Sequence, residues 1–177
     1  MQETIVLRYG HRIARDFRVT SHCALVARAF GAKKIIICGA EDPALAKRAE
    51  KISKHWGGSF QVSFADQWRR EIEKYRSEGF KIIHLTMYGV PVTKKMKQIQ
   101  KNKKLLIVIG SQKVERAVYD TADLNISITL QPHSEIAALA VFLDRLFEGK
   151  FLSKEFKNSK IAISPKEKGK GVLRQTG

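Results

Sequence analysis

The chain has 177 residues, with 33 Lys and Arg against 17 Asp and Glu and a formal net charge of +16. This length suits one domain with a short appendage, and such a chain buries about 70% of its unfolded surface on folding. No apolar run reaches the ~18 residues that span a bilayer, and the N-terminus lacks a secretory pattern. We therefore expect a cytoplasmic protein with no membrane segment. The excess charge indicates a polyanionic partner, for which nucleic acid fits better than a membrane surface.

Short runs of β-branched residues alternate with helical patterns along the chain. We predict strands at residues 4–8, 34–38, 60–64, 81–85, 105–109 and 123–128. We predict helices at residues 21–30, 42–56, 66–77 and 132–147. The strands are nearly unbroken Val, Ile and Leu, which is typical of a parallel sheet buried on both faces. The predicted fold class is therefore α/β, a mostly parallel sheet with helices on both faces.

Two segments are unusually basic. Residues 89–104 carry six Lys and no acid, and residues 150–177 carry eight Lys or Arg against two Glu. We divide the chain into a domain at 1–150 and a basic C-terminal extension at 151–177, in which residues 160–164 and 171–174 suit a hairpin. Lysines of the first segment would neutralise nucleic-acid phosphates without reading sequence. The candidates for binding the nucleic acid are Arg12, Lys94, Lys95, Lys97, Lys101, Lys103 and Lys104.

The two cysteines, Cys23 and Cys38, form no CxxC pair. A structural zinc site needs four ligands at short local spacings, so we predict no metal. Both thiols are expected to be buried as small hydrophobic side chains. A disulfide between them is expected only in a heat-adapted cell.

Ligands in open α/β sheets bind outside the carboxyl ends of the strands. Four predicted loops follow strands, at residues 9–19, 86–92, 110–115 and 129–135. Each loop taken alone is also consistent with a plain turn. Neither GxGxxG after the first strand nor GxxxxGK[ST] occurs, which argues against a Rossmann dinucleotide site and a P-loop ATPase.

The first of these loops carries arginines at every third position, Arg12, Arg15 and Arg18. Guanidinium groups bind phosphate in a bidentate fork, so this loop suits phosphate recognition. A solvated basic edge is the alternative interpretation. His22 is the imidazole nearest to this loop.

Three segments, in this order, resemble the three motifs of the SPOUT methyltransferases: RDFRVTSHCALVARAFGAKKI, LLIVIGSQKVERAVYDTADLNISI and QPHSEIAALAVFLDRL. The first segment and HLTMYG resemble most closely the archaeal tRNA (cytidine-56-2′-O)-methyltransferase family. The resemblance covers about residues 1–150. It implies a trefoil-knotted fold, S-adenosylmethionine as the cofactor, tRNA as the partner and a homodimer. The implied reaction is methylation of the ribose 2′-hydroxyl of cytidine 56 in the T-loop.

The resemblance also implies site residues. The cofactor pocket would involve Leu85, Gly110, Ser111, Gln112, Lys113, Val114, Ile128, Leu130, Pro132, His133, Ser134 and Glu135. Related ribose methyltransferases place a catalytic Arg five residues before the Phe of AFGA, and this chain has Leu25 there. Arg18 and Arg15 are therefore the catalytic candidates, with His22 as the proton acceptor. A helix-capping or packing role is the alternative for His22, and we interpret His84 as structural.

Two other functions remain open at this stage. The basic charge fits a non-enzymatic RNA-binding α/β domain with a vestigial pocket equally well. A SPOUT methyltransferase with a different RNA target is the second alternative.

Overall fold

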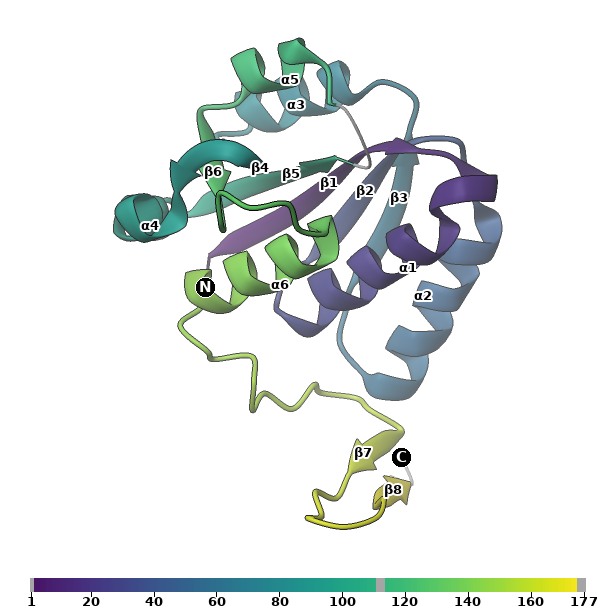
Figure 1. The fold of residues 1–177 in the computed structure, drawn as a ribbon. Helices are drawn as coiled ribbons and strands as arrows, with labels where there is room; N and C mark the ends of the chain where they lie inside the picture. Colours follow the sequence, from purple (N-terminus) through teal and green to yellow (C-terminus); the bar gives the residue numbers. More distant parts are fainter. Residues whose placement is uncertain (1, 111–113, 175–177) are drawn as a thin grey trace.

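Six strands form a parallel sheet in the order β3-β2-β1-β5-β4-β6 in this computed structural model (Figure 1). The structure describes residues 2–110 and 114–174. All five strand pairings are parallel, which confirms the predicted α/β class. The strands are β1 (Glu3–His11), β2 (Lys34–Gly39), β3 (Gln61–Ala65), β4 (Lys81–Pro91), β5 (Lys104–Gly110) and β6 (Leu124–Ser127).

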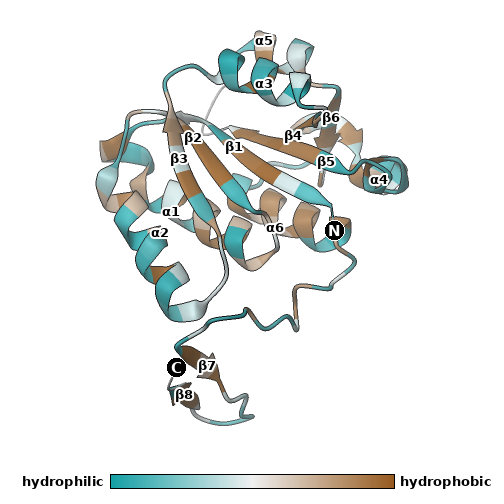
Figure 2. Cartoon of the chain, turned by 180° about the vertical axis from the view of Figure 1, so that it is seen from behind, coloured by the Kyte–Doolittle hydropathy of each residue, from teal (hydrophilic) through white to brown (hydrophobic). Residues whose placement is uncertain are grey.

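Helices cover both faces of the sheet (Figure 1). They are α1 (Ile13–Ala29), α2 (Pro43–Trp56), α3 (Trp68–Ser77), α4 (Val92–Gln100), α5 (Arg116–Thr121) and α6 (Glu135–Leu146). Successive residues of a strand point to opposite faces. Val6 thus joins the core beneath α1 and α6, whereas Leu7 joins the core that includes Trp68 and Ile72 of α3. Figure 2 shows the result as apolar strands between helices with hydrophilic outer faces.

The arginine-rich segment is helical, which corrects the predicted loop at residues 9–19. β1 continues to His11 and α1 begins at Ile13, eight residues before the predicted helix start. Asp16 in the first turn accepts hydrogen bonds from the backbone N–H of Arg12 (3.1 Å) and from its Nε (3.0 Å). These bonds satisfy an orphan N–H group and place a carboxylate at the positive end of the helix dipole. Arginines three residues apart therefore share a helix face.

Two helices were not predicted from the sequence. In α4, Val92 and Ile99 are buried and Met96 packs against the same core, at the helical spacing i, i+4, i+7. The lysines between them concealed this apolar stripe. The short helix α5 buries Val118 against the opposite core.

The C-terminal extension is docked on the end of the domain and finishes in the antiparallel hairpin β7 (Ile161–Ile163) and β8 (Val172–Arg174). The ring of Phe151 occupies the space beside Gly31, where an added Cβ would lie 2.2 Å from that ring. The Arg28 guanidinium lies 4.7 Å from the centre of the Phe156 ring. The hairpin itself is partly apolar and exposed (Figure 2). The domain boundary at residue 150 stays a prediction.

Among the described residues, no helix is long and apolar enough to cross a membrane. The same residues contain no group of three or more His, Cys, Asp and Glu side chains placed to hold a metal ion. Cys23 and Cys38 are both free and buried, and burial raises the pKa of each thiol to about 12. Thiols with such a pKa are poor nucleophiles at neutral pH.

Candidate active site

A cavity of about 580 Å³ opens at the carboxyl ends of β4 and β5, beside the start of α6. Open α/β sheets bind ligands outside the carboxyl ends of their strands, which is where this cavity lies. The lining residues are His84, Leu85, Thr86, Met87, Tyr88, Ile109, Gly110, Val114, Tyr119, Pro132, His133, Glu135 and Ala138.

An interruption in β4 shapes one wall of this cavity. Leu85 and Val90 are both in register with Ile126 of β6, so residues 86–89 leave the ladder between them. Three of these four residues line the cavity. The fourth, Gly89, passes so close to β6 that an added Cβ would lie 2.5 Å from backbone atoms of Asn125 and Ile126. A glycine is therefore required where the excursion returns to the sheet.

Half of the predicted cofactor residues line the cavity, and these are Leu85, Gly110, Val114, Pro132, His133 and Glu135. Ile128 packs against the core, and Leu130 is exposed. Ser134 caps α6, because its Oγ accepts a hydrogen bond of 3.2 Å from the Ala137 N–H. Ser111, Gln112 and Lys113 lie outside the described residues.

His84 belongs to the cavity wall, which adds to the structural role predicted for it. Asn125 Nδ2 donates to the Tyr119 carbonyl oxygen (2.9 Å), so Asn125 Oδ1 is the acceptor that faces His84 Nδ1 at 2.8 Å. His84 Nδ1 therefore carries the proton in the neutral ring, and Nε2 is an acceptor. Burial lowers the pKa of His84 from 6.5, despite the opposing hydrogen bond with Asn125. The sequence signal for this contact was the position of His84 in the last residues of a strand, two positions before the predicted loop at 86–92.

The lowered pKa of His84 predicts a loss of stability in acid. Between the folded pKa and the unfolded value of 6.5, the unfolded chain binds more protons than the native one. This contribution to stability is complete above pH 6.5 and is lost as the pH falls through the folded pKa. Denaturant titrations at pH 7.5 and 5.5 should show that the free energy of unfolding falls less between these pH values in His84→Gln than in the unmodified chain. An equal loss in both proteins would contradict this assignment, and exposed His133→Gln serves as the control.

An ion pair that the sequence did not reveal lies beneath the cavity. Arg8 of β1 has no exposed surface, and its Nη2 lies 3.4 Å from Glu135 Oε1. Its Nε and Nη1 are buried without a hydrogen-bond partner among the described residues. A buried guanidinium is costly without its counter-ion. Glu135 therefore both lines the cavity and neutralises the charge below it.

Removing this counter-ion should destabilise the protein. We expect Glu135→Gln to lower the free energy of unfolding by about 2 kcal/mol, since it leaves Arg8 buried and uncompensated. Urea unfolding without cofactor measures this loss. The control is Glu148→Gln, whose carboxylate pairs with Lys150 at the surface, and we expect it to change stability by about 0.5 kcal/mol or less. Equal losses in the two variants would refute the proposed importance of the buried pair.

The predicted catalytic side chains do not line the cavity of their own chain. Arg15, Arg18 and His22 are exposed and follow one another at helical spacing along α1. Arg12 is engaged by Asp16. Burial alone would raise the pKa of Asp16, but the hydrogen bonds from Arg12 outweigh it and lower that pKa. The two halves of the predicted site are thus separate within one chain.

The predicted RNA-binding lysines are spread over two regions. Lys94, Lys95 and Lys97 lie on α4, which directly follows β4. The other three are Lys101, Lys103 and Lys104. They lie at or just before the amino end of β5, whereas the cavity lies at the carboxyl ends of the strands.

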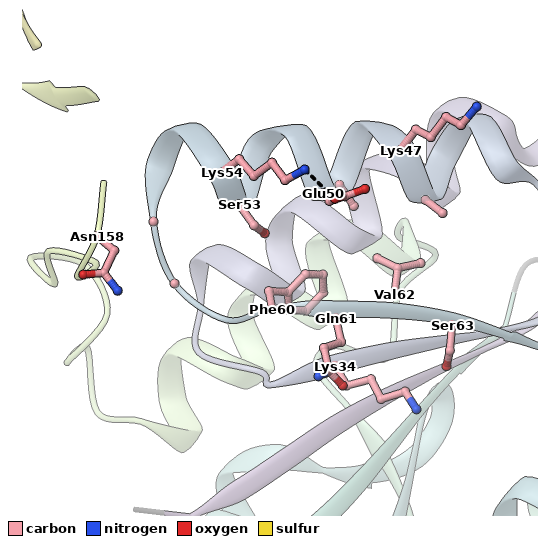
Figure 3. Close-up of a pocket in the computed structure, with 14 residues that line it drawn as sticks. Lys34, Lys47, Glu50, Ser53, Lys54, Phe60, Gln61, Val62, Ser63 and Asn158 are labelled. Carbon is pink, nitrogen blue, oxygen red and sulfur yellow. Dashed lines mark ion pairs between the residues drawn. The ribbon is translucent and has the colours of Figure 1, made fainter. Parts of the chain in front are cut away.

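A separate cavity of about 620 Å³ lies between α2 and β3 (Figure 3). Its lining includes Lys34, Lys47 and Asn158, and Lys54 is paired with Glu50 at its rim (Figure 3). Lys34 begins β2, so this cavity lies at the amino ends of the strands. The carboxyl-end cavity, which the strand-end loops surround, is the better candidate for an active site.

Comparisons with known proteins identify the family of this chain. The family described as "tRNA ribose 2′-O-methyltransferase, aTrm56" matches residues 56–173. A tRNA (cytidine(56)-2′-O)-methyltransferase of Thermococcus kodakarensis is 49% identical over 172 residues, covering 95% of each chain.

Solved structures show the same fold at low sequence identity. The A. aeolicus TrmH/SpoU tRNA modifying enzyme superposes with a TM-score of 0.62 at 15% identity, over 85% of this chain and 76% of that one. The SpoU methyltransferase AviRb of Streptomyces viridochromogenes, in complex with the cofactor AdoMet, gives 0.60 at 14% identity, over 86% and 58%. The family match at residues 56–173 covers the later part of the predicted domain and most of the predicted extension. This chain belongs to the tRNA ribose 2′-O-methyltransferase family aTrm56.

Proposed function

We propose that this protein transfers a methyl group from S-adenosylmethionine to the ribose 2′-hydroxyl of cytidine 56 in tRNA. The observation that carries the proposal is the 49% identity, over 95% of both chains, to an enzyme of that name. The cavity at the carboxyl ends of β4 and β5 supplies a site of suitable size, since small-ligand pockets occupy about 300–1,000 Å³.

The cavity lining fits S-adenosylmethionine, which supplies a methyl group activated on a cationic sulfonium. Leu85, Ile109 and Val114 provide apolar walls for the adenosine part. Glu135 is the one carboxylate among the described lining residues, and it suits a ligand that carries positive charge. Gly110 allows backbone groups to approach the ligand closely.

The arginines of α1 would act on the ribose hydroxyl. A guanidinium stays protonated, with a pKa above about 12, so Arg18 or Arg15 would orient the hydroxyl and stabilise negative charge on its oxygen. His22, one turn along α1 from Arg18, would accept the proton. The hydroxyl must be held in line with the transferred methyl, about 3 Å from it.

A homodimer would unite the two halves of the site. Arg15, Arg18 and His22 are exposed and do not line the cavity of their own chain. We propose that α1 of one subunit lies over the cavity of its partner. We also propose that the enzyme works in the cytoplasm, where its tRNA substrate is found.

The decisive experiment locates the methylated nucleotide. Unmodified tRNA is incubated with the protein and labelled S-adenosylmethionine, and the product is mapped by nuclease digestion and mass spectrometry. We expect one 2′-O-methylcytidine at position 56. A methyl group at another nucleotide would reassign the target, and binding of tRNA without methyl transfer would favour a non-enzymatic RNA-binding protein.

The tip of the extension is expected to add to tRNA affinity through phosphate contacts. Phe151 and Phe156 pack against the domain, so charge replacement is a cleaner test than deletion. A triple variant with Lys166, Lys168 and Lys170 changed to Gln should reduce the slope of log K against log[salt] by about 2. Filter binding at several salt concentrations measures the slope. A control with Lys33, Lys74 and Lys81 changed to Gln removes equal charge elsewhere, and an equal reduction there would exclude a specific role for the extension.

A further inference from the structure

We propose that the groove between α1 and α2 is a second RNA-binding site, which receives one nucleotide of the tRNA near the methylated ribose. The inference rests on the proposed function, because it takes tRNA to be the substrate. It assigns a function to a groove that lies apart from the cofactor cavity.

The groove has a volume of about 220 Å³ and largely apolar walls. Leu25 of α1 is 42% exposed, although it is a large aliphatic residue, and it faces this space together with Ile52 and Phe60. The full lining is Ser21, His22, Ala24, Leu25, Arg28, Leu45, Arg48, Ala49, Ile52 and Phe60. Walls of this kind suit the faces of a nucleobase, which stack on aromatic and apolar side chains.

The polar part of the groove is cationic. Arg28, Arg48 and His22 are its titratable residues, and none of the described lining residues is acidic. The Arg48 guanidinium lies 4.6 Å from the centre of the Phe17 ring, which holds it at the surface of α2. A stacked guanidinium keeps its N–H groups available for a phosphate. An apolar slot bordered by arginines and free of acids is complementary to a nucleotide.

Two polar atoms in the groove wall lack partners. Ser21 Oγ and Arg28 Nε are buried and have no hydrogen-bond partner among the described residues. Arg28 Nη2 is engaged by the Gly57 carbonyl oxygen, so the guanidinium is fixed while Nε remains unused. Buried polar groups without partners are uncommon and call for an explanation. Both atoms are covered, so a ligand that accepts hydrogen bonds would satisfy them only after a small opening of the groove.

The groove adjoins the predicted catalytic face of α1. His22 lines the groove and follows Arg18 by four residues, which is one helical turn. A nucleotide bound here would therefore lie beside the residue that acts on the ribose hydroxyl. The positive charge of Arg28 and Arg48 favours RNA over a second copy of this basic chain, whose net charge is +16.

The test uses one variant that fills the groove without changing charge and one that removes a charge. Ala49 is half-buried in the lining, so Ala49→Phe places a ring in the slot. Arg48→Gln removes one cation of the groove. Lys51→Gln is the matched control, because Lys51 is exposed on the same helix and does not line the groove. Affinity is measured by fluorescence anisotropy with a labelled tRNA T-arm stem–loop, and S-adenosylhomocysteine binding is measured by calorimetry.

We expect Ala49→Phe to weaken RNA binding about tenfold, since base stacking is worth about 1–3 kcal/mol per base. We expect Arg48→Gln to weaken it by a similar factor, since it removes a charge-assisted contact with phosphate. Lys51→Gln should weaken it about twofold or less, and all three variants should bind S-adenosylhomocysteine normally. RNA affinity unchanged in both groove variants would overturn the proposal. A change in oligomeric state of Ala49→Phe, measured by sedimentation, would overturn it in favour of a subunit interface. Normal RNA binding through the groove without methylation of cytidine 56 would refute only the proposed function.

Discussion

Arg18→Ala is expected to lower kcat for methyl transfer by about 100-fold, with S-adenosylmethionine binding unchanged. A fixed donor that stabilises negative charge on a reacting oxygen is typically worth this factor or more. Arg15→Ala is the parallel test, since Arg15 lies one turn earlier on the same exposed face of α1. Rates are measured at saturating cofactor and tRNA, and cofactor binding is measured by calorimetry. If neither variant slows methyl transfer, α1 does not carry the catalytic arginine.

Hybrid dimers can show whether this arginine acts across the subunit interface. Gly110→Trp would fill the cavity of one subunit, and Arg18→Ala would remove the arginine of the other. Alone, the Gly110→Trp variant should be inactive, and the Arg18→Ala variant should be about 100-fold slower than the unmodified enzyme. Their mixture should regain activity, because a hybrid contains one site with an intact cavity and an arginine from the Gly110→Trp subunit. A mixture that stays inactive would place the arginine and the cavity in the same subunit.

Gly89→Ala is expected to cost at least about 3 kcal/mol of stability. The added Cβ would lie 2.5 Å from the backbone of Asn125 and Ile126 in β6, and backbone in a paired strand cannot move aside. The return of β4 beside β6 also shapes the cavity wall, so cofactor affinity should fall with stability. Urea unfolding and calorimetry measure the two effects.

Gly79→Ala is the matched control for this substitution. Gly79 has a φ of +86°, and nothing lies within 4 Å of an added Cβ. Gly79→Ala should therefore lower the free energy of unfolding by only about 1 kcal/mol, which is the cost of placing alanine in a left-handed backbone conformation. Similar losses at Gly79 and Gly89 would show that the close passage of β4 past β6 is not a constraint.

The sequence predicted the sheet more reliably than the site. Apolar runs such as those of β2 and β5 are buried on both faces, so their composition alone identified them. Asp42, the first residue of the helix predicted at 42–56, caps α2, because its Oδ1 accepts from the N–H groups of Ala44 and Leu45, both at 3.1 Å. The start of α1 was predicted too late in the chain. Its first turns carry three charged residues and bury only the polar residues Asp16 and Thr20, so they show no apolar helical pattern.

The residues that the prediction missed at the site share a physical cause. Arg8 lies in a strand of hydrophobic residues, and only its pairing with Glu135, 127 positions away, explains how a guanidinium can be buried there. His84 acquires its tautomer from Asn125 and Tyr119, which reach it from β6 and α5. Contacts over such sequence distances leave no local periodicity to detect.

By itself the sequence determined the α/β class, the basic character that favours nucleic acid, and three of the four strand-end segments that it proposed for the site, which contribute to the cavity. These properties follow from the composition and from the local spacing of apolar residues, both of which are visible in the sequence. The tertiary structure alone decided that α1 presents Arg15 and Arg18 away from the cavity of its own chain, and that Gly89 passes against β6. It also placed Arg8 beneath Glu135. The physical reason is that burial, charge compensation and close backbone passage depend on which distant segments meet, and only the folded chain fixes those meetings.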